Sequence, residues 1–299
     1  MRLLSIVVFA CAFARPVSAQ LYETVGIRAQ GMAGAFVAVA DDSTATWWNP
    51  AGLASGAYFS GSIEHRTGEG IYDEGTLGVS LMVPSLGLSY YRVRVGAVQP
   101  SSSTVPTGEA GQDQDAGIRS LTFSLTQFGV TTGQSLGEHL VVASTAKLVR
   151  ADQTRGDLDL GALAKAGSIR LGISARNMFA PDLTVDGNPI EHKRQVRVGA
   201  AVFTSSRRGV SLVAAVDADL TTTATAGGEA RHVAGGGEVR AGRLGLRGGV
   251  SVNSIGEVRS SYSGGASLAI RQGMFLDAHL TRGDDDAMKA WGFALRVTY

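Results

Sequence analysis

Few residues of this chain have the types and the spacing that covalent or metal chemistry requires. Its histidines are His65, His139, His192, His232 and His279. None stands in a metal-ligand spacing such as His-Glu-x-x-His, and the chain has neither a Gly-x-Ser-x-Gly nucleophile turn nor a phosphate-binding glycine loop. Asp277 and His279 share one strand face and could orient a nucleophile, but inward polar residues are expected anyway. We therefore expect no enzyme, no cofactor and no bound metal.

Charged residues recur instead at alternate positions of otherwise apolar segments. They are Arg92, Arg94, Lys147, Asp157, Asp159, Lys165, Arg170, Arg176, Arg197, Asp217, Asp219, Arg247, Arg271, Asp277 and Arg296. Because successive side chains of a strand point to opposite faces, we expect these charges on the face opposite the apolar one. Both signs occur, so they could form ion pairs that brace an interior, or line a polar path for a solute.

The clearest strand is the end of the chain, residues 289–299. Its apolar face consists of Trp291, Phe293, Leu295, Val297 and Tyr299. The opposite face carries Arg296, a pattern typical of a barrel strand between lipid and a polar lumen. A soluble antiparallel sheet with one buried face is the alternative. The aromatic end resembles the outer-membrane targeting signal of bacterial β-barrels, which implies that role for Trp291, Phe293 and Tyr299.

The beginning of the chain has the pattern of a secretory signal peptide. Arg2 precedes an apolar run at residues 3–14, and Val17-Ser18-Ala19 offers a small-residue cleavage site. We expect residues 1–19 to be removed, so that the mature chain begins at Gln20. The run is too short to span a bilayer as a helix, and no later segment has about eighteen uninterrupted apolar residues. Only a closed barrel could then span the membrane.

Composition favours the same class of protein. Of 299 residues, 40 are glycine, 44% are hydrophobic and only 18% are charged, yet no apolar run is long. The formal net charge of +1 becomes −1 if Arg2 and Arg15 leave with the signal, so nucleic acid is not an expected partner. The single cysteine, Cys11, lies in the signal, and we expect neither disulfides nor a thiolate metal site.

The connections between period-two segments alternate in length. Short turns are expected at residues 84–85, 167–168, 272–273 and near Gly242, and long polar loops at 99–117, 178–192 and 220–228. Residues 131–138 are the exception, because they are longer than expected for one of the short turns. This alternation is typical of outer-membrane barrels. We predict an all-β fold over residues 56–299, a transmembrane antiparallel β-barrel of about fourteen strands.

One predicted strand changes parity at Tyr90-Tyr91. Leu86, Leu88 and Tyr90 place apolar residues on even positions, whereas the following apolar residues are on odd positions. An inserted residue of this kind predicts a β-bulge, and bulges concentrate at barrel rims and functional openings. We interpret Tyr90 and Tyr91 as a lateral window in the wall, with a bulge that only adjusts the twist as the alternative.

Residues 20–55 break the period-two pattern and are expected to fold inside the barrel. The notable residues are Gly31, Gly34, Asp41, Asp42, Trp47, Trp48, Asn49, Pro50 and Ala51. Asn49 before Pro50 is a helix N-cap followed by proline at the first helical position, and the glycines permit close backbone approach or positive φ. Two adjacent tryptophans need a core, and the barrel lumen is the only one nearby.

This block resembles the N-terminal signature of the FadL superfamily of outer-membrane proteins. Its members carry a glycine-alanine run, an Ala-Asp-Asp step and an Asn-Pro-Ala motif, which match residues 31–35, 40–42 and 49–51 here. Ala33 stands where the motif often has glycine. The resemblance implies that the segment is a hatch that plugs the barrel. By length the chain resembles the shorter PorV-type branch more than the longer fatty-acid and aromatic-hydrocarbon transporters.

Two functions follow from the resemblance. The first is passive transport of small hydrophobic molecules, with a hatch that blocks the lumen until the ligand shifts it. The second is a PorV-like accessory role, in which the barrel is a scaffold that holds a secreted or surface protein through the loops at residues 99–117 and 178–192. An open porin ranks third, because a hatch defeats free diffusion.

The expected location is the outer membrane of a Gram-negative-type bacterium. The expected partners are outer-membrane lipid and lipopolysaccharide, the barrel assembly machinery, and either a small hydrophobic ligand or a protein of a secretion system. Asp284, Asp285 and Asp286 could hold a divalent ion together with lipopolysaccharide, although a solvated acidic loop tip is the simpler interpretation.

Overall fold

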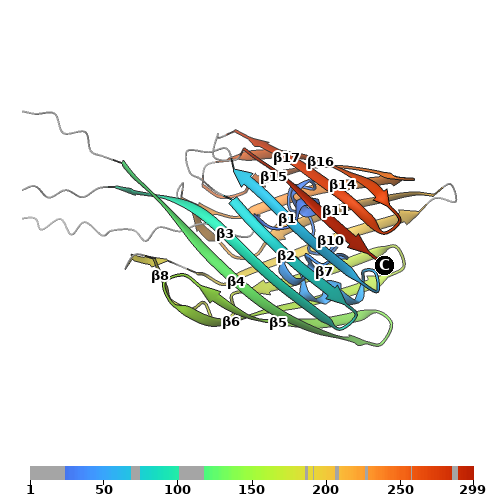
Figure 1. The fold of residues 1–299 in the computed structure, drawn as a ribbon, viewed down its shortest axis with the longest axis horizontal. Helices are drawn as coiled ribbons and strands as arrows, with labels where there is room; N and C mark the ends of the chain where they lie inside the picture. The colour runs from blue at the N-terminus through green and yellow to red at the C-terminus, as the bar shows by residue number, and fades with distance from the viewer. Residues whose placement is uncertain are drawn as a thin grey trace, which may run out of the picture.

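The structure is a computed structural model in which fourteen strands close into one antiparallel barrel (Figure 1). It describes residues 24–68, 75–100, 118–185, 188–190, 192–205, 209–225, 228–256, 258–284 and 289–299. The barrel strands are β1 (Ser60–Gly68), β2 (Gly75–Val83), β3 (Leu86–Pro100), β4 (Ile118–Leu136), β5 (Leu140–Arg150), β6 (Thr154–Ala166), β7 (Ile169–Arg176), β10 (Gln195–Ser205), β11 (Val210–Asp219), β14 (His232–Ala241), β15 (Leu244–Asn253), β16 (Ser260–Arg271), β17 (Met274–Gly283) and β18 (Ala290–Thr298). The antiparallel pairing of β1 with β18 closes the barrel.

The alternation in the sequence is realised as two faces of the wall. On β18, Trp291 and Phe293 are exposed on the outside, whereas Ala294 and Arg296 are buried on the inside. The same holds around the barrel for the outward residues Leu77, Val79, Leu81, Leu171, Ile173, Leu246 and Leu276. The wall therefore carries an apolar outer surface, and the predicted all-β barrel of about fourteen strands is confirmed.

The short connections are tight turns that need positive φ. Gly167, Gly242 and Gly273 have φ of 59°, 56° and 74°, which glycine adopts without strain. Ser85 has φ of 72° in the turn between β2 and β3. Residues 131–138 do not form the longer turn expected from the sequence. β4 continues to Leu136 and pairs with β5 up to Leu140, so that only Gly137 and its neighbours turn.

The long connections contain two small hairpins that the sequence did not predict. β8 (Leu183–Val185) pairs with β9 (Asn188–Ile190), and β12 (Thr223–Thr225) pairs with β13 (Gly228–Ala230). The loop of residues 101–117, the signal at residues 1–19 and the acidic residues at 285–286 lie outside the described residues.

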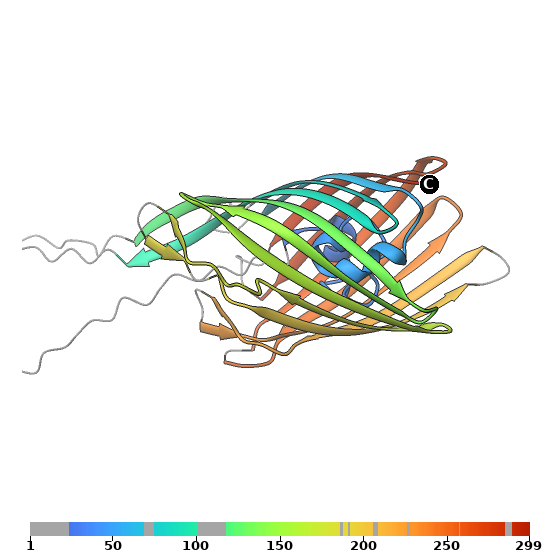
Figure 2. The ribbon, with the colours of Figure 1, turned by 90° about the horizontal axis from the view of Figure 1, so that it is seen from below.

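The N-terminal segment lies inside the barrel, where the sequence analysis predicted it (Figure 2). It contains α1 (Ile27–Gln30), α2 (Ala45–Trp48) and the 3-10 helix η2 (Pro50–Ala54), and its side chains are almost all buried. We call residues 24–55 the hatch. It lies toward the end of the barrel that holds the C-terminus and the short turns (Figure 2). Within the described ranges, none of the helices is long and apolar enough to cross a membrane.

The predicted β-bulge at Tyr90 and Tyr91 is wrong. β3 pairs without a register shift with β2 from Leu86 to Arg94, and with β4 along its whole length. Tyr90 is 40% exposed on the outside and Tyr91 is fully buried inside, as in any regular strand. The parity changes because Tyr91 and Val93 point inward at apolar neighbours while Arg92 points outward, so no window follows from this strand.

Candidate functional site

The hatch is fastened to the wall by two barrel carboxylates that accept backbone N–H groups. Asp217 on β11 accepts hydrogen bonds from the amides of Phe36 and Val37 at 2.7 and 2.8 Å. Glu64 on β1 accepts from the amides of Gly26 and Ile27 at 2.8 and 3.3 Å. Charge-assisted bonds of this kind are stronger than neutral ones. Sequence reasoning placed Asp217 inside but missed Glu64, whose strand gave no clear alternation.

Arg28 is the centre of a charged cluster between the hatch and the wall. Its guanidinium makes a bidentate pair with Glu238 on β14 at 2.8 and 3.0 Å, and also contacts Asp41 and Asp42 of the hatch, the latter at 3.2 Å. Burial alone would lower the pKa of Arg28, but the three carboxylates outweigh it and raise that pKa well above its ordinary value. Arg28 therefore stays charged and links three acidic groups.

Ion pairs continue from this cluster along the wall. Glu238 also contacts Arg240 at 2.7 Å and Arg247 on β15 at 3.5 Å. Arg247 reaches Asp277 on β17 at 2.9 Å, and Arg296 on β18 reaches the same carboxylate at 2.8 Å. Alternating charges on four strands, β14, β15, β17 and β18, thus brace this part of the wall. Two residues expected inside, Arg92 and Arg271, are instead exposed.

A second cluster of charges braces the wall toward the long-loop end. Buried Lys147 on β5 contacts Asp159 on β6 at 2.6 Å and Asp157 at 3.3 Å. The same lysine donates a hydrogen bond to Asn177 at 2.6 Å, and Asn177 in turn donates to the carbonyl of Lys193 at 3.0 Å. The loop after β7 is therefore tied at both of its ends to the charged interior.

The acidic pair of the hatch has two separate uses. Asp41 contacts Arg28 across the hatch. Asp42 accepts hydrogen bonds from the backbone amide and the hydroxyl of Thr44 at 3.0 and 2.5 Å, which begins the turn into α2. The pair thus joins the fold of the hatch to its charged contact with the wall.

Asn49 joins three parts of the molecule with one amide. Its Oδ1 accepts from the amide of Ala51 at 3.1 Å and caps η2, which begins at Pro50. Its Nδ2 donates to the carbonyl of Val37 at 2.9 Å and to that of Ala162 on β6 at 3.2 Å. The N-cap is present, and the same side chain also fastens η2 to the wall.

The two tryptophans pack in different directions. Trp48 is buried in the hatch, where its indole N–H donates to the carbonyl of Val25 at 3.0 Å and its ring meets Phe36 edge-on. Trp47 faces the wall, edge-on to Tyr91 with ring centroids 5.1 Å apart, and under the guanidinium of Arg176 at 3.8 Å. Trp47 is therefore an aromatic contact of the hatch with Tyr91 and Arg176 of the lumen wall.

Glycines let the hatch approach the wall at backbone distance. A Cβ at Gly236 would lie 2.4 Å from the carbonyl oxygen of Met32, and one at Gly172 would lie 2.7 Å from that of Val37. Within the hatch, a Cβ at Gly52 would lie 2.0 Å from the carbonyl oxygen of Ala40. Gly34 has φ of 81°. A Cβ at Gly31 would meet the side chain of Arg247 at 2.7 Å.

An apolar strip runs along the inside of β3, β4 and β5. Tyr91 and Val93 on β3, Leu125 on β4 and Val149 on β5 are all buried, and Val93 lies directly opposite Leu125 in the register. The strip reaches Trp47 of the hatch, and Leu183 of β8 packs on Leu125 and Val149 at its far end. Sequence reasoning missed the strip, although the parity change at Tyr90-Tyr91 was its signal.

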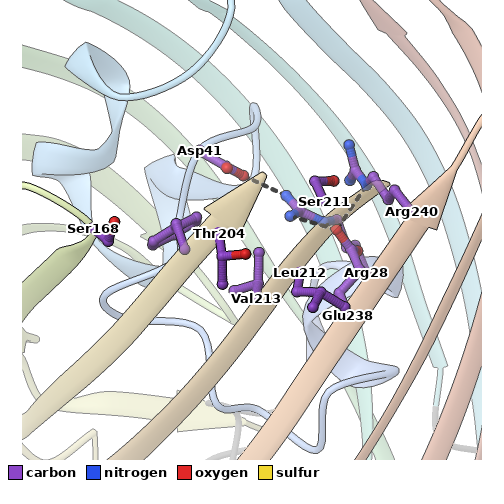
Figure 3. A pocket seen from close by; sticks show the side chains of 10 residues that line it. Arg28, Asp41, Ser168, Thr204, Ser211, Leu212, Val213, Glu238 and Arg240 are labelled. Carbon is purple, nitrogen blue, oxygen red and sulfur yellow. Dashed lines mark hydrogen bonds and ion pairs between the residues drawn. The ribbon is translucent and has the colours of Figure 1, made fainter. Parts of the chain in front are cut away.

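A cavity of about 450 Å³ lies on another side of the hatch, against β10, β11 and β14 (Figure 3). Its walls include Arg28 and Asp41 of the hatch, Phe203 and Val213 of the wall, and Arg240 near the end of β14. Ser168, in the tight turn between β6 and β7, also lines it, so the cavity lies at the short-turn end.

Several solved structures have folds similar to this chain. The chain is similar to the CymD monoaromatic hydrocarbon channel, with 12% identity, a TM-score of 0.62 and coverage of 93% of this chain and 97% of that one. It is similar to the Ralstonia pickettii toluene transporter TbuX (13% identity, TM-score 0.63, coverage 93% and 99%) and to the P. putida toluene transporter TodX (10%, 0.61, 92% and 97%). No family model matches the chain, and no curated protein matches it. At these identities, the likeness shows the fold.

Proposed function

We propose that this protein is a FadL-type outer-membrane channel for small hydrophobic molecules, and that the hatch is its gate. The observation that carries the proposal is the apolar strip of Tyr91, Val93, Leu125 and Val149. It lies inside a wall whose other buried residues are mostly polar or charged, and it leads to Trp47 of the hatch. Leu125 and Val149 lie outside the hatch core, beneath Leu183 of β8, so the apolar surface extends further than the packing of the hatch requires.

The outer surface supports a place in the outer membrane. Exposed leucine, isoleucine, valine and aromatic side chains surround the barrel, as lipid contact requires. Trp291, Phe293 and Tyr299 lie exposed on the last strand and at the chain end, where they could act in targeting and at the membrane interface. The predicted signal peptide would bring the chain to that membrane.

The contacts of the hatch support its role as a gate. Asp217 and Glu64 of the wall bind the hatch backbone, and Asn49 and Arg28 of the hatch bind the wall, so the hatch is held by a limited set of polar contacts that a movement could exchange with water. An apolar solute at Trp47 would favour a displaced hatch only if it binds that state more tightly. We infer that the solute follows the strip and shifts the hatch in this way.

The similar channels are described as acting on toluene and monoaromatic hydrocarbons, so toluene is the first probe. Uptake of radiolabelled toluene would be measured in Gram-negative cells with intact lipopolysaccharide, because that leaflet slows direct entry of apolar solutes. Cells with the protein should take up toluene faster than cells without it. Equal uptake would contradict transport and would leave the accessory scaffold as the better hypothesis.

A matched pair of variants tests the path itself. Val93 on β3 and Ser251 on β15 are both buried inside the lumen, on strands far apart in the barrel order. Val93→Asp places a carboxylate in the apolar strip, which should lower uptake at least about fivefold because apolar solutes avoid a charged wall. Ser251→Asp adds the same charge away from the strip and should leave uptake nearly unchanged. Equal losses in both variants would show that charge in the lumen matters, and the strip does not.

A further inference from the structure

We propose that the cavity at the short-turn end is a binding site for a small aromatic carboxylate. Its volume of about 450 Å³ lies within the range of small-molecule sites. It is bounded by the hatch residues Arg28 and Asp41 and by wall residues of β10, β11 and β14, strands that β6 and β7 separate from the apolar strip on β3 to β5. The inference goes beyond the proposed channel function.

Arg240 is the arginine of the cavity wall with the fewest acceptors. The wall holds two arginines, Arg28 and Arg240, and two carboxylates, those of Asp41 and Glu238. Glu238 is shared with Arg28 and Arg247, but these two have further carboxylate partners, Asp41 and Asp42 for Arg28 and Asp277 for Arg247. Arg240 has no ion pair other than Glu238 among the described residues. Because a guanidinium has five N–H donors, one shared carboxylate cannot satisfy all the donors of Arg240.

Two guanidinium groups, that of Arg240 on the cavity wall and that of Arg170 above the Phe203 ring, keep buried N–H donors without a partner. The Nη2 of Arg240 and the Nη1 of Arg170 are out of contact with solvent and make no hydrogen bond within the described part of the chain. Arg240 points along the cavity wall beside Ser211 and Glu238 (Figure 3). A buried donor without an acceptor is costly, and a carboxylate is the acceptor that guanidinium groups bind most strongly.

The apolar side of the cavity indicates that the ligand has an aromatic ring. Phe203 on β10 and Val213 on β11 line it, and the guanidinium of Arg170 lies over the Phe203 ring at 3.9 Å. An aromatic ring could pack beside Phe203 while its carboxylate accepts from Arg240 and Arg170. The site would thus recognise the two properties together, a flat apolar body and a negative charge.

The test is calorimetric titration of the folded, detergent-solubilised protein with benzoate, and with benzyl alcohol and acetate as the ring-only and charge-only probes. We expect saturable binding of benzoate, and binding of the other two weaker by at least about tenfold, because each lacks one of the recognised groups. Benzyl alcohol binding as tightly as benzoate would overturn the assignment of an anion site. Absence of saturable benzoate binding would overturn the site altogether.

Two variants and a matched control locate the binding. Arg240→Gln and Arg170→Gln each remove one donor group and should weaken benzoate binding at least about tenfold. Arg271→Gln removes an exposed charge in the next short-turn region, at the end of β16, and should leave binding unchanged. Benzoate affinity that is equal in all three variants and the natural protein would contradict the assignment. Because the titration involves no uptake, it and the toluene experiment can fail independently.

Discussion

Among the described residues of the hatch, Arg28 has the most charged partners. It contacts Glu238 of the wall and Asp41 and Asp42 of the hatch. Removal of one partner from a buried charge cluster is strongly destabilising, because the remaining charges lose their compensation. Glu238 would keep Arg240 and Arg247, but the two hatch carboxylates would lose their cation. Removal of Arg28 should therefore destabilise the hatch and leave the stability of the wall unchanged.

Arg28→Ala should loosen the hatch while the barrel stays folded. By the usual cost of an uncompensated buried charge, we expect a loss of about 3 to 5 kcal/mol in the local stability of residues 24–55. Hydrogen exchange read by mass spectrometry would show faster exchange of the hatch amides, with the strands unchanged. Arg271→Ala, at an exposed position, is the control and should alter neither. Exchange of the hatch as slow as in the natural protein would contradict the role given to Arg28.

At the scale of elements, the hatch is a set of short turns whose backbone comes closest to its neighbours at glycine positions, which have no side chain. η2 packs against the preceding hatch segment through Gly52, and the wall accepts the hatch backbone at Gly172 and Gly236. The β-ladder does not include Gly52, so a change there should separate the folding of the hatch from that of the barrel.

Gly52→Ala should prevent the hatch from packing. A Cβ at this position would lie 2.0 Å from the carbonyl oxygen of Ala40, a backbone atom that cannot rotate away. Overpacking usually costs about 1 to 3 kcal/mol, and a backbone clash this close should exceed that range. Ion conductance in planar bilayers should rise, while the heat-dependent gel shift of a folded barrel persists.

Gly156→Ala is the matched control, because a Cβ on that β6 residue meets no atom within 4 Å. It should leave conductance as low as in the natural protein. If Gly52→Ala behaved like this control, the hatch would not be the element that closes the lumen.

Much of the element arrangement could be predicted from the sequence, because side chains of a barrel strand alternate between lipid and lumen. Trp291, Phe293 and Leu295 show this directly, and the barrel prediction is confirmed. The prediction at Tyr90-Tyr91 was wrong because it took polar as inward and apolar as outward. The inward side chain of Tyr91 packs against Trp47 of the hatch, so this lumen-facing position is occupied by an apolar residue.

The contacts between hatch and wall could not be predicted, because alternation says which face a residue occupies and not what it meets there. Glu64 binds backbone amides of a segment 37 and 38 residues earlier in the chain. Inward glycines such as Gly172 and Gly236 were a usable signal, since a wall position without a side chain leaves room for another backbone.

At the scale of the whole molecule, the interior is divided by the hatch. The apolar strip with Leu183 over its far end lies on the β3 to β5 side, and the charged cavity lies at the short-turn end against β10 to β14. A molecule that follows the strip meets Trp47 before it reaches that cavity. On our account, passage through the barrel therefore requires the hatch to move.

The most direct test locks the hatch to the wall with a reversible bond. A Cβ at Gly87 on β3 would lie 2.7 Å from Cγ2 of Thr46 in α2, close enough for a disulfide between Thr46→Cys and Gly87→Cys. The natural chain has one cysteine, Cys11, in the predicted signal, so the new pair would be the only one in the mature protein. Each single cysteine variant is a control.

Toluene uptake would be measured with the lock oxidised and again after reduction. The account predicts uptake lower by at least about fivefold in the oxidised state, with recovery on reduction, because a fixed hatch keeps the binding-competent state unpopulated. The single variants should respond to neither treatment. Equal uptake with the lock closed and open would contradict the claim that the hatch is the gate.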